Sequence, residues 1–291
     1  MDVRRFFRCV RMDLFRGAGA GRQNNDANNK LRESVLLNLR HSTDPALNDL
    51  RNSWQHTLST LCPHPHNDIV VKKLGGRSAN HDFQFLYTQD GTPILTVNAE
   101  FKHNAASISK LPQYLSVAAD KPYLPRLYAD FFYDFLDRIC DVYPGLSQHK
   151  PDKETYLRLI HNTGYDRHPF FQTLYDMEGA GTIEQVKQKK QIVKESIRLY
   201  LETYANSLNI AQLTQDIRER QVGKVFVLWN LREFVVDSIR EDEMEITHVE
   251  GIKNNNTIVA VSKAGTKHMM LLRWKNHLGV LYPAWQISLS R

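Results

Sequence analysis

The 291-residue sequence has no run of about 18 apolar residues, the length that a transmembrane helix needs. We therefore expect no membrane-spanning segment and no membrane partner. Its three cysteines, Cys9, Cys62 and Cys140, are far apart, odd in number and form no CxxC pair. This scarcity excludes a disulfide framework and indicates a reducing, intracellular compartment, which we expect to be the cytoplasm. The twelve histidines do not occur at the spacing of a structural zinc site.

Several common catalytic motifs are also absent. The sequence contains no GxxxxGK[ST], GxGxxG, GxSxG or HExxH. Each of these patterns builds a specific phosphate, dinucleotide, nucleophile or zinc site. Their absence excludes nucleotide-driven motors, Rossmann dehydrogenases, serine hydrolases of the elbow type and the common metalloproteases.

The charge balance is modestly basic, with a formal net charge of +6 and a pI of about 9.1. Such a balance favours a polyanionic partner such as nucleic acid. Residues 1–29 concentrate arginine and then turn to glycine, alanine and asparagine, so we expect a flexible basic segment. This segment could be an arm that lies on phosphates, a presequence for an organelle, or a poorly ordered terminus.

Hydrophobic periodicity predicts the order of elements. Apolar residues recur at helical spacing in several segments: 30–42, 44–62, 106–120, 125–144, 152–176 (with a break) and 181–208. Short stretches rich in β-branched and aromatic residues predict strands: 69–74, 81–88, 94–102, 224–239, 257–264, 268–276 and 284–289. Asp90-Gly91 is a hairpin-turn signal between the second and third strands.

This order predicts one α/β domain over residues 30–291, with a mixed central sheet flanked by helices. We expect a core at about 30–120 and 221–240, a helical insertion at about 121–210 and a β-rich C-terminal region at 241–291.

Two acids and a lysine stand out on the strands beside the Asp90-Gly91 turn. Because strand side chains alternate between faces, Glu100 and Lys102 point the same way, and Asp82 should pair with Glu100 across the hairpin. Neighbouring carboxylates repel unless a cation lies between them. Magnesium prefers oxygen ligands, so we expect it to be held by Asp82, Glu100 and the backbone carbonyl of Phe101. Lys102 would orient or help to deprotonate a water that attacks phosphorus.

The pattern Asp82…Glu100-Phe101-Lys102 resembles the motif of the PD-(D/E)xK nuclease superfamily, and the element order is similar to that of a type II restriction endonuclease. The resemblance implies a restriction-endonuclease-like core, one or two Mg²⁺ ions in the active site, double-stranded DNA as substrate and a homodimer. One departure is that Asn80-His81, and not proline, precedes Asp82. Glu33 is the candidate for an additional acid from the first helix.

Gln113 follows the motif on the predicted helix 106–120 and could position the water or a phosphate, or be an exposed helix residue. The QxxxY pattern of some exonucleases is absent, because Val117 stands at the tyrosine position. Candidates for nucleic-acid contacts lie in loops around the motif and on the longest helix: Ser78, Asn80, His103, Asn104, Lys187, Lys190 and Lys194. Solvation of loops and of a helix face explains these polar residues equally well.

The sequence thus predicts a magnesium-dependent endonuclease that hydrolyses phosphodiester bonds in double-stranded DNA, a type II restriction enzyme in a prokaryotic or virus-infected cell. The alternatives are a viral or repair nuclease without sequence specificity, acting on DNA or RNA, and a non-catalytic nucleic-acid-binding protein on the same fold.

Overall fold

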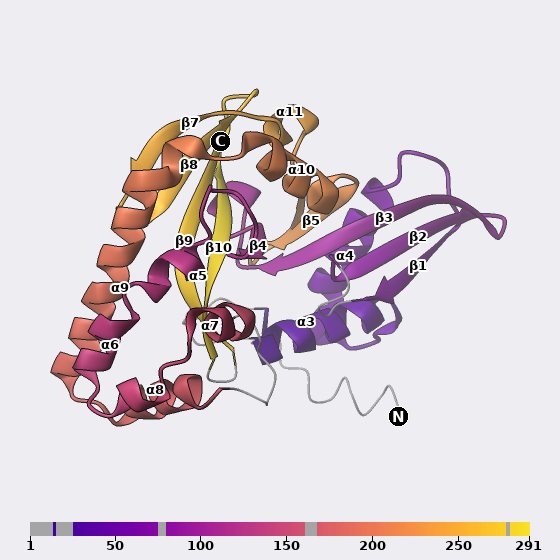
Figure 1. Cartoon of the computed structure of the whole chain (residues 1–291). Coiled ribbons are helices and arrows are strands. Elements are labelled where there is room, and N and C mark those ends of the chain that lie inside the picture. The colour runs from indigo at the N-terminus through magenta and orange to yellow at the C-terminus, as the bar shows by residue number, and fades with distance from the viewer. Residues whose placement is uncertain (1–13, 16–25, 75–79, 161–167, 278–279) are drawn as a thin grey trace. The chain divides into compact units, whose positions relative to one another are not determined.

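The computed structural model describes residues 14–15, 26–74, 80–160, 168–277 and 280–291. The chain divides into two compact units (Figure 1). The first unit comprises 1–111 and 218–241, and the second comprises 112–217 and 242–291. Most of the predicted flexible segment 1–29 lies outside the described residues. Two parts of it are described: a helix begins at Asp26, and Phe15 is buried in the core of the first unit, so the segment is not flexible throughout.

A five-stranded mixed sheet forms the centre of the first unit, in the order β1-β2-β3-β5-β6. The first three strands form an antiparallel meander, β5 lies parallel to β3, and β6 returns antiparallel to β5. The bounds are β1 (Asp68–Lys73), β2 (Phe83–Gln89), β3 (Thr92–His103), β5 (Lys224–Trp229) and β6 (Phe234–Asp237). The strands predicted at 69–74, 81–88, 94–102 and 224–239 are therefore confirmed, the last as two strands.

Two helices pack on one face of this sheet, α3 (Asp26–Asn38) and α4 (Asn48–Thr60). The Asp44 side chain accepts a hydrogen bond from the Ala46 amide, and Pro45 opens the 3₁₀ turn η3 (Pro45–Leu47) that leads into α4. Trp54 of α4 makes edge contacts with the ring of Phe85 on β2. Another 3₁₀ turn, η2 (Leu39–His41), follows α3.

The helix expected over 106–120 is wrong. This stretch contains a 3₁₀ turn, η4 (Ile108–Lys110), and then a strand, β4 (Leu115–Ala118), which pairs with β10 in the second unit. Leu115, Val117 and Ala119 are buried at every second position, which is the period of a strand. The alternation is short, and the helical interpretation overlooked it.

The second unit contains another five-stranded sheet, in the order β4-β10-β9-β8-β7. Its strands are antiparallel throughout: β7 (Ile246–Lys253), β8 (Thr257–Ser262), β9 (Lys267–His277) and β10 (Val280–Ser290) pair in sequence. The predicted β-meander is confirmed, and β7 precedes it as a strand that the sequence analysis missed. The alternation in β7 is weak, because polar residues occupy most of its positions.

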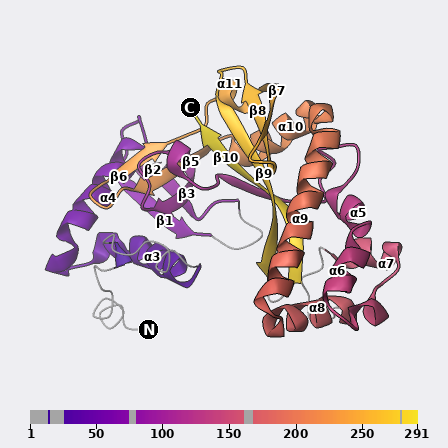
Figure 2. The same ribbon diagram turned by 90° about the vertical axis from the view of Figure 1, so that its left-hand side faces the viewer.

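Helices make up the rest of the second unit: α5 (Tyr128–Tyr133), α6 (Leu136–Val142), η5 (Leu146–His149), α7 (Lys153–Leu159), α8 (Pro169–Ala180), α9 (Ile183–Tyr204), η6 (Ala205–Ser207), most of α10 (Ile210–Gln221) and most of α11 (Glu241–Met244). The single helix predicted at 125–144 is two helices, α5 and α6. A capping box between Thr182 and Gln185 starts α9. Figure 2 shows α9 beside α5, where the rings of Tyr128 and Tyr200 are 5.2 Å apart. The break predicted within 152–176 falls partly on 161–167, outside the described residues.

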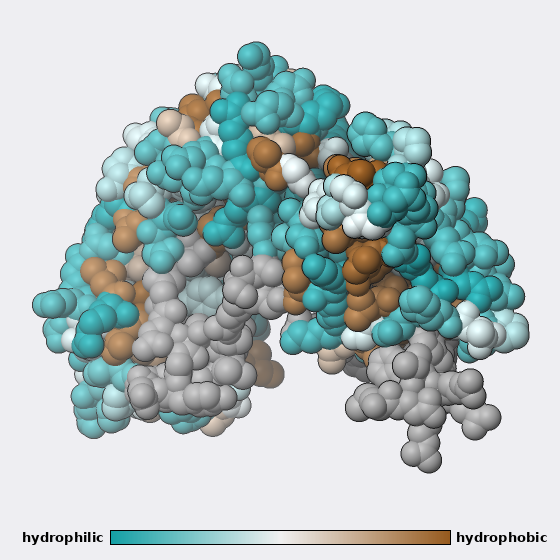
Figure 3. All heavy atoms as spheres, turned by 90° about the vertical axis from the view of Figure 1, so that its right-hand side faces the viewer, coloured by the Kyte–Doolittle hydropathy of each residue, from teal (hydrophilic) through white to brown (hydrophobic). Residues whose placement is uncertain are grey.

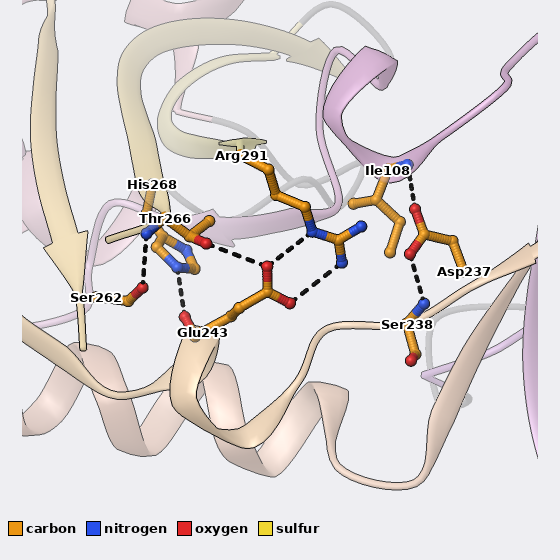
Figure 4. A network of polar contacts seen from close by, with 8 residues as sticks. All are labelled: Ile108, Asp237, Ser238, Glu243, Ser262, Thr266, His268 and Arg291. Carbon is orange, nitrogen blue, oxygen red and sulfur yellow. Dashed lines mark hydrogen bonds and ion pairs between the residues drawn. The ribbon is translucent and has the colours of Figure 1, made fainter. Parts of the chain in front are cut away.

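A buried polar network ties α11 to the last strands of the second unit (Figure 4). The Glu243 side chain is fully buried, and its carboxylate accepts hydrogen bonds from Arg291 and from the Thr266 hydroxyl. The same figure shows a separate contact of the first unit, in which Asp237 accepts a hydrogen bond from the Ile108 amide at 2.9 Å. Both acids are satisfied by donors, so we assign them structural roles.

The face seen in Figure 3 is mostly hydrophilic, with apolar side chains gathered in separate patches. Among the described residues, no helix combines the length and apolar character that crossing a membrane requires.

Candidate functional site

The hairpin of β2 and β3 aligns the two predicted acids. Asp90 and Gly91 have φ angles of 51° and 79°, as a two-residue type I′ turn requires. Phe83 pairs with Ala99, so the register continued by one residue places Asp82 opposite Glu100. The Asp82 amide donates a hydrogen bond to the Ala99 carbonyl at 3.0 Å, and its carboxylate accepts one from the Phe101 amide at 2.9 Å, so Asp82 lies beside the Ala99–Phe101 part of β3.

A β-bulge makes this register possible. Gln89 pairs with Thr92 and Thr88 with Pro93, but Tyr87 pairs with Leu95, so Ile94 has no partner on β2. Asp82 lies eight positions before Asp90, whereas Glu100 lies nine positions after Gly91. Without the extra residue, every side chain of β3 beyond the bulge would shift by one position, and Asp82 would face the wrong neighbour.

The faces of β3 alternate as predicted. Val97, Ala99 and Phe101 are buried in the core of the first unit. Glu100 and Lys102 lie on the other face and are only partly buried, with 17% and 32% of their side chains exposed. The structure therefore brings Asp82, Glu100 and Lys102 together, as the motif requires.

The Asp82 carboxylate occupies a poorly solvated position. Burial raises the pKa of Asp82 from its ordinary value of 3.8 to about 6, and the nearby Glu100 and Glu33 charges act in the same direction. A hydrogen bond from the Phe101 amide at 2.9 Å and the charge of Lys102 oppose this rise only in part. An acid in this state gains most from an added cation.

Glu100 is held by two lysines. Its Oε1 lies 2.6 Å from Lys102 Nζ, and its Oε2 lies 2.7 Å from Lys224 Nζ. Burial opposes ionisation of Glu100, but the two ammonium groups outweigh it and hold the pKa of this carboxyl below its ordinary value. Burial also acts to lower the pKa of Lys102, but the acids around it, first of all Glu100, raise it. Lys102 is therefore an ammonium at neutral pH, and it acts as a donor and not as a base.

Lys224 is the main residue of this cluster that the sequence analysis missed. It opens β5, and only 4% of its side chain is exposed. Its ammonium also lies 3.4 Å from the Asn80 carbonyl and 5.1 Å from the centre of the Phe226 ring. The sequence does show a lysine at the start of the apolar run KVFVLW. Its contact with Glu100 depends on the pairing of β5 with β3, which a local sequence pattern does not predict.

Glu33, the candidate acid of the first helix, also belongs to the cluster. It lies on α3 with 12% of its side chain exposed, and its Oε2 is 3.1 Å from Lys73 Nζ. Its negative charge acts on both Asp82 and Lys102. Lys73, at the end of β1, is a second cation that the sequence analysis did not single out.

Two histidines flank the motif. Burial lowers the pKa of His103 to about 4, with the Arg32 charge acting in the same direction, so His103 is neutral at physiological pH. Burial and Lys224 lower the pKa of His81. The Nε2 atom of each ring is buried and has no hydrogen-bond partner among the described residues. The half-buried His103 is therefore a poor nucleic-acid contact.

The other residues predicted to contact nucleic acid lie in several different places. Asn80 is exposed and donates to the Arg220 carbonyl at 2.6 Å, and Asn104 is exposed in a turn with φ 58°. Ser78 lies outside the described residues. Lys187, Lys190 and Lys194 are exposed on α9, in the second unit.

The expectation for Gln113 rested on the helix that the structure replaces. Gln113 lies between η4 and β4, in the second unit, whereas the acids and Lys102 lie in the first. No described contact joins it to the cluster, so its assignment as a catalytic residue loses its structural basis.

The donors of the cluster fit a hard cation in type. Asp82 and Glu100 offer only oxygen atoms, as Mg²⁺ prefers, and Mg²⁺ often takes just one or two protein carboxylates and keeps several waters. Among the described residues, no group of three or more His, Cys, Asp or Glu side chains is arranged to hold a metal ion.

Comparison of the chain with protein-family models, with curated proteins and with solved structures gives no match. What the protein does must therefore be argued from the cluster itself.

Proposed function

We propose that the first unit is a magnesium-dependent endonuclease of the PD-(D/E)xK kind, which hydrolyses phosphodiester bonds in double-stranded DNA. The observation that carries the proposal is that Asp82 directly precedes the Phe83–Ala99 pair and feels the charges of Glu100 and Lys102, which share one face of β3. This arrangement depends on the bulge at Ile94. An acid and an E-x-K sequence that occurred by chance on two strands would not be expected to come with a bulge at the position that aligns them.

The topology of the first unit supports the same proposal. Helices precede a three-stranded antiparallel meander, and a later strand, β5, lies parallel to β3. The resemblance to restriction endonucleases implies these elements in this order, but also a helix at 106–120, which the structure replaces with η4 and β4. Residues 112–217 of the second unit lie between β3 and β5. The acid from the first helix, Glu33, lies close enough for its charge to act on Asp82 and Lys102.

Each residue of the cluster has a role in this proposal. Asp82, Glu100 and the Phe101 carbonyl would hold Mg²⁺. When bound, the ion supplies a water of lowered pKa and offsets negative charge on the phosphoryl group. Lys102, as an ammonium, donates to the attacking water or to a phosphate oxygen. Lys224 fixes the second oxygen of Glu100.

A type II restriction enzyme that cuts as a homodimer, in the cytoplasm of a prokaryotic or virus-infected cell, is the specific form that we propose. A second candidate is a non-catalytic nucleic-acid-binding protein. It is favoured by one observation, namely that lysines occupy both oxygens of Glu100. In that case the lysines replace the metal permanently.

One experiment separates these proposals. The purified full chain is incubated with plasmid and with unmethylated phage DNA, in Mg²⁺ or in EDTA, beside Lys102→Ala and the exposed-surface control Lys72→Ala. Discrete bands that need Mg²⁺, that Lys102→Ala loses and that Lys72→Ala keeps support a restriction enzyme. A smear with the same dependence supports a nuclease without sequence specificity, and RNA offered in parallel tests that alternative. A gel shift without cleavage of any substrate refutes the enzyme and favours the binding protein.

A further inference from the structure

The sheet of the second unit has one face against helices and one face open. Side chains of β9 alternate between the two faces. Trp274 points to the helices, where its ring centre lies 4.7 Å from that of Phe132 on α5. Lys267 and Arg273 point to the other face and are exposed. We call this surface the open face; it comprises every second residue of β9 from Lys267 to Lys275, with Gln286 of β10 and Ser116 of β4 beside them.

Two cations of the open face have no acid beside them. Arg273 donates a hydrogen bond from Nη1 to the side-chain oxygen of Gln286 at 3.0 Å, and Lys275 donates one from Nζ to the Ser116 hydroxyl. Among the described residues, neither cation forms an ion pair with a carboxylate. Burial lowers the pKa of Lys275, and the charge of Arg273 acts in the same direction, so the two cations repel each other. An anion placed between them would offset this repulsion.

Neutral side chains hold the two cations in place. The Gln286 amide nitrogen donates to the Pro112 carbonyl at 2.7 Å, which directs the amide oxygen towards Arg273. Because Ser116 accepts from Lys275, its own hydroxyl hydrogen is not used in that contact. A guanidinium, an ammonium and a hydroxyl are therefore gathered on neighbouring strands as donors, and phosphate oxygens are acceptors that suit them.

The shape of the open face favours a long anion over a small one. Its cations lie along one strand on a sheet surface, and Lys267, which pairs with Glu250 at 2.6 Å, is eight positions and about 27 Å from Lys275. The five open-face residues of β9 include no aromatic side chain. Stacking of single-stranded bases and the anchors of protein interfaces both use aromatic side chains, so a duplex held by its phosphates fits this face best.

We propose that the open face of the second unit binds the phosphate backbone of double-stranded DNA, with Arg273, Lys275 and the Ser116 hydroxyl as donors. The inference rests on the proposed function in one respect, that DNA is the partner, and it requires no catalysis. Phosphate contacts fix the position of a protein on DNA without reading its sequence. The open face therefore positions the duplex and leaves base recognition to other residues.

The test measures the affinity of the full chain for two short fluorescent duplexes of unrelated sequence, in EDTA and at several salt concentrations. Arg273→Gln with Lys275→Gln should lower the slope of log K against log salt by about 2, equally for both duplexes. The control, Lys72→Gln with Lys110→Gln, removes the same charge from exposed positions of the first unit and should change the slope little. Circular dichroism checks that the variants keep the fold.

Three results would overturn the proposal. The first is a double variant with the wild-type slope, or a loss that the control pair equals. The second is a loss confined to one duplex, which would indicate base contacts. The third is displacement of DNA by polyglutamate at equal charge concentration, which would favour an acidic protein as the partner. Plasmid cleavage in Mg²⁺ separates this inference from the nuclease: a slope loss without cleavage refutes only the nuclease, and cleavage without a slope loss refutes only the open face.

Discussion

Lys224 Nζ lies 2.7 Å from Glu100 Oε2, although 124 positions separate the two residues in the sequence. The parallel pairing of β5 with β3 brings them together, and only 4% of the Lys224 side chain is exposed. The pair explains how Glu100 stays ionised in a half-buried position without a metal. It also implies that a divalent cation at Glu100 would share this carboxylate with Lys224.

Lys224→Met should therefore destabilise the protein in the absence of metal. It removes one of the two donors of a buried carboxylate, which costs about 1–3 kcal/mol in the free energy of unfolding. Magnesium should recover more of that stability in the variant than in the wild type, because the ion supplies the missing positive charge. Urea unfolding with and without Mg²⁺ measures both effects.

The exposed Lys72→Met is the matched control and should change the free energy of unfolding by less than about 0.5 kcal/mol. A Lys224→Met protein as stable as the wild type would show that the contact with Glu100 contributes little. If Mg²⁺ stabilised the wild type and Lys224→Met equally, the ion would not be sharing the Glu100 carboxylate with Lys224.

Asp82→Asn should have the opposite effect on stability at neutral pH. The folded state raises the pKa of Asp82 from 3.8 to about 6, so it holds this proton more tightly than the unfolded chain does. The contribution of Asp82 to stability then falls as pH rises through this range, and at pH 7 the ionised carboxylate costs about 3 kcal/mol. The asparagine side chain of the variant has no charge to desolvate, and its carbonyl oxygen can still accept from the Phe101 amide.

The measurement is urea unfolding of Asp82→Asn and wild type between pH 4 and pH 7. The variant should be more stable at pH 7, and the difference should shrink towards zero near pH 4. Asp120→Asn, at an exposed position of the second unit, should show no such trend. If Asp82→Asn were less stable than the wild type at pH 7, the ionised Asp82 carboxylate would stabilise the folded state and not destabilise it.

The local parts of the site could be predicted from the sequence. Strand parity set Glu100 and Lys102 on one face, and the Asp90-Gly91 turn identified the hairpin. The hairpin pairs Phe83 with Ala99, next to Asp82 and Glu100, but the bulge at Ile94 on which this register depends gave no recognisable signal. Lys224 could not be predicted, because strand pairing over 124 positions is decided by the packing of the whole first unit.

The errors have a physical origin too. The segment 106–120 is rich in residues that suit a helix, yet Leu115 and Val117 are buried against β10 as a strand. Pairing with a strand near the C-terminus outweighed local propensity. Gln113 was assigned through that helix, so the error in secondary structure became an error in the site.

Two glycines should respond in opposite ways to the same change. Gly91 has φ +79° in the hairpin turn, where a side chain is strained even though space is open. Gly91→Ala should cost about 1 kcal/mol, and Gly179→Ala, within α8 and also in open space, should gain about 0.5 kcal/mol. Thermal unfolding of the two variants checks the signs. A gain at Gly91 would mean that the turn has a different backbone conformation.

The three exposed lysines of α9 allow a quantitative test of DNA contact. If Lys187, Lys190 and Lys194 each neutralise a phosphate, changing all three to Gln should lower the slope of log K against log salt by about 3. The measurement is DNA affinity by fluorescence anisotropy at several salt concentrations, in EDTA to prevent cleavage.

The control is the triple change of Lys72, Lys110 and Lys253 to Gln, which removes the same charge from other exposed positions. A smaller loss of slope in this control would locate DNA contact on α9. An equal loss would mean that α9 contributes only to the net charge.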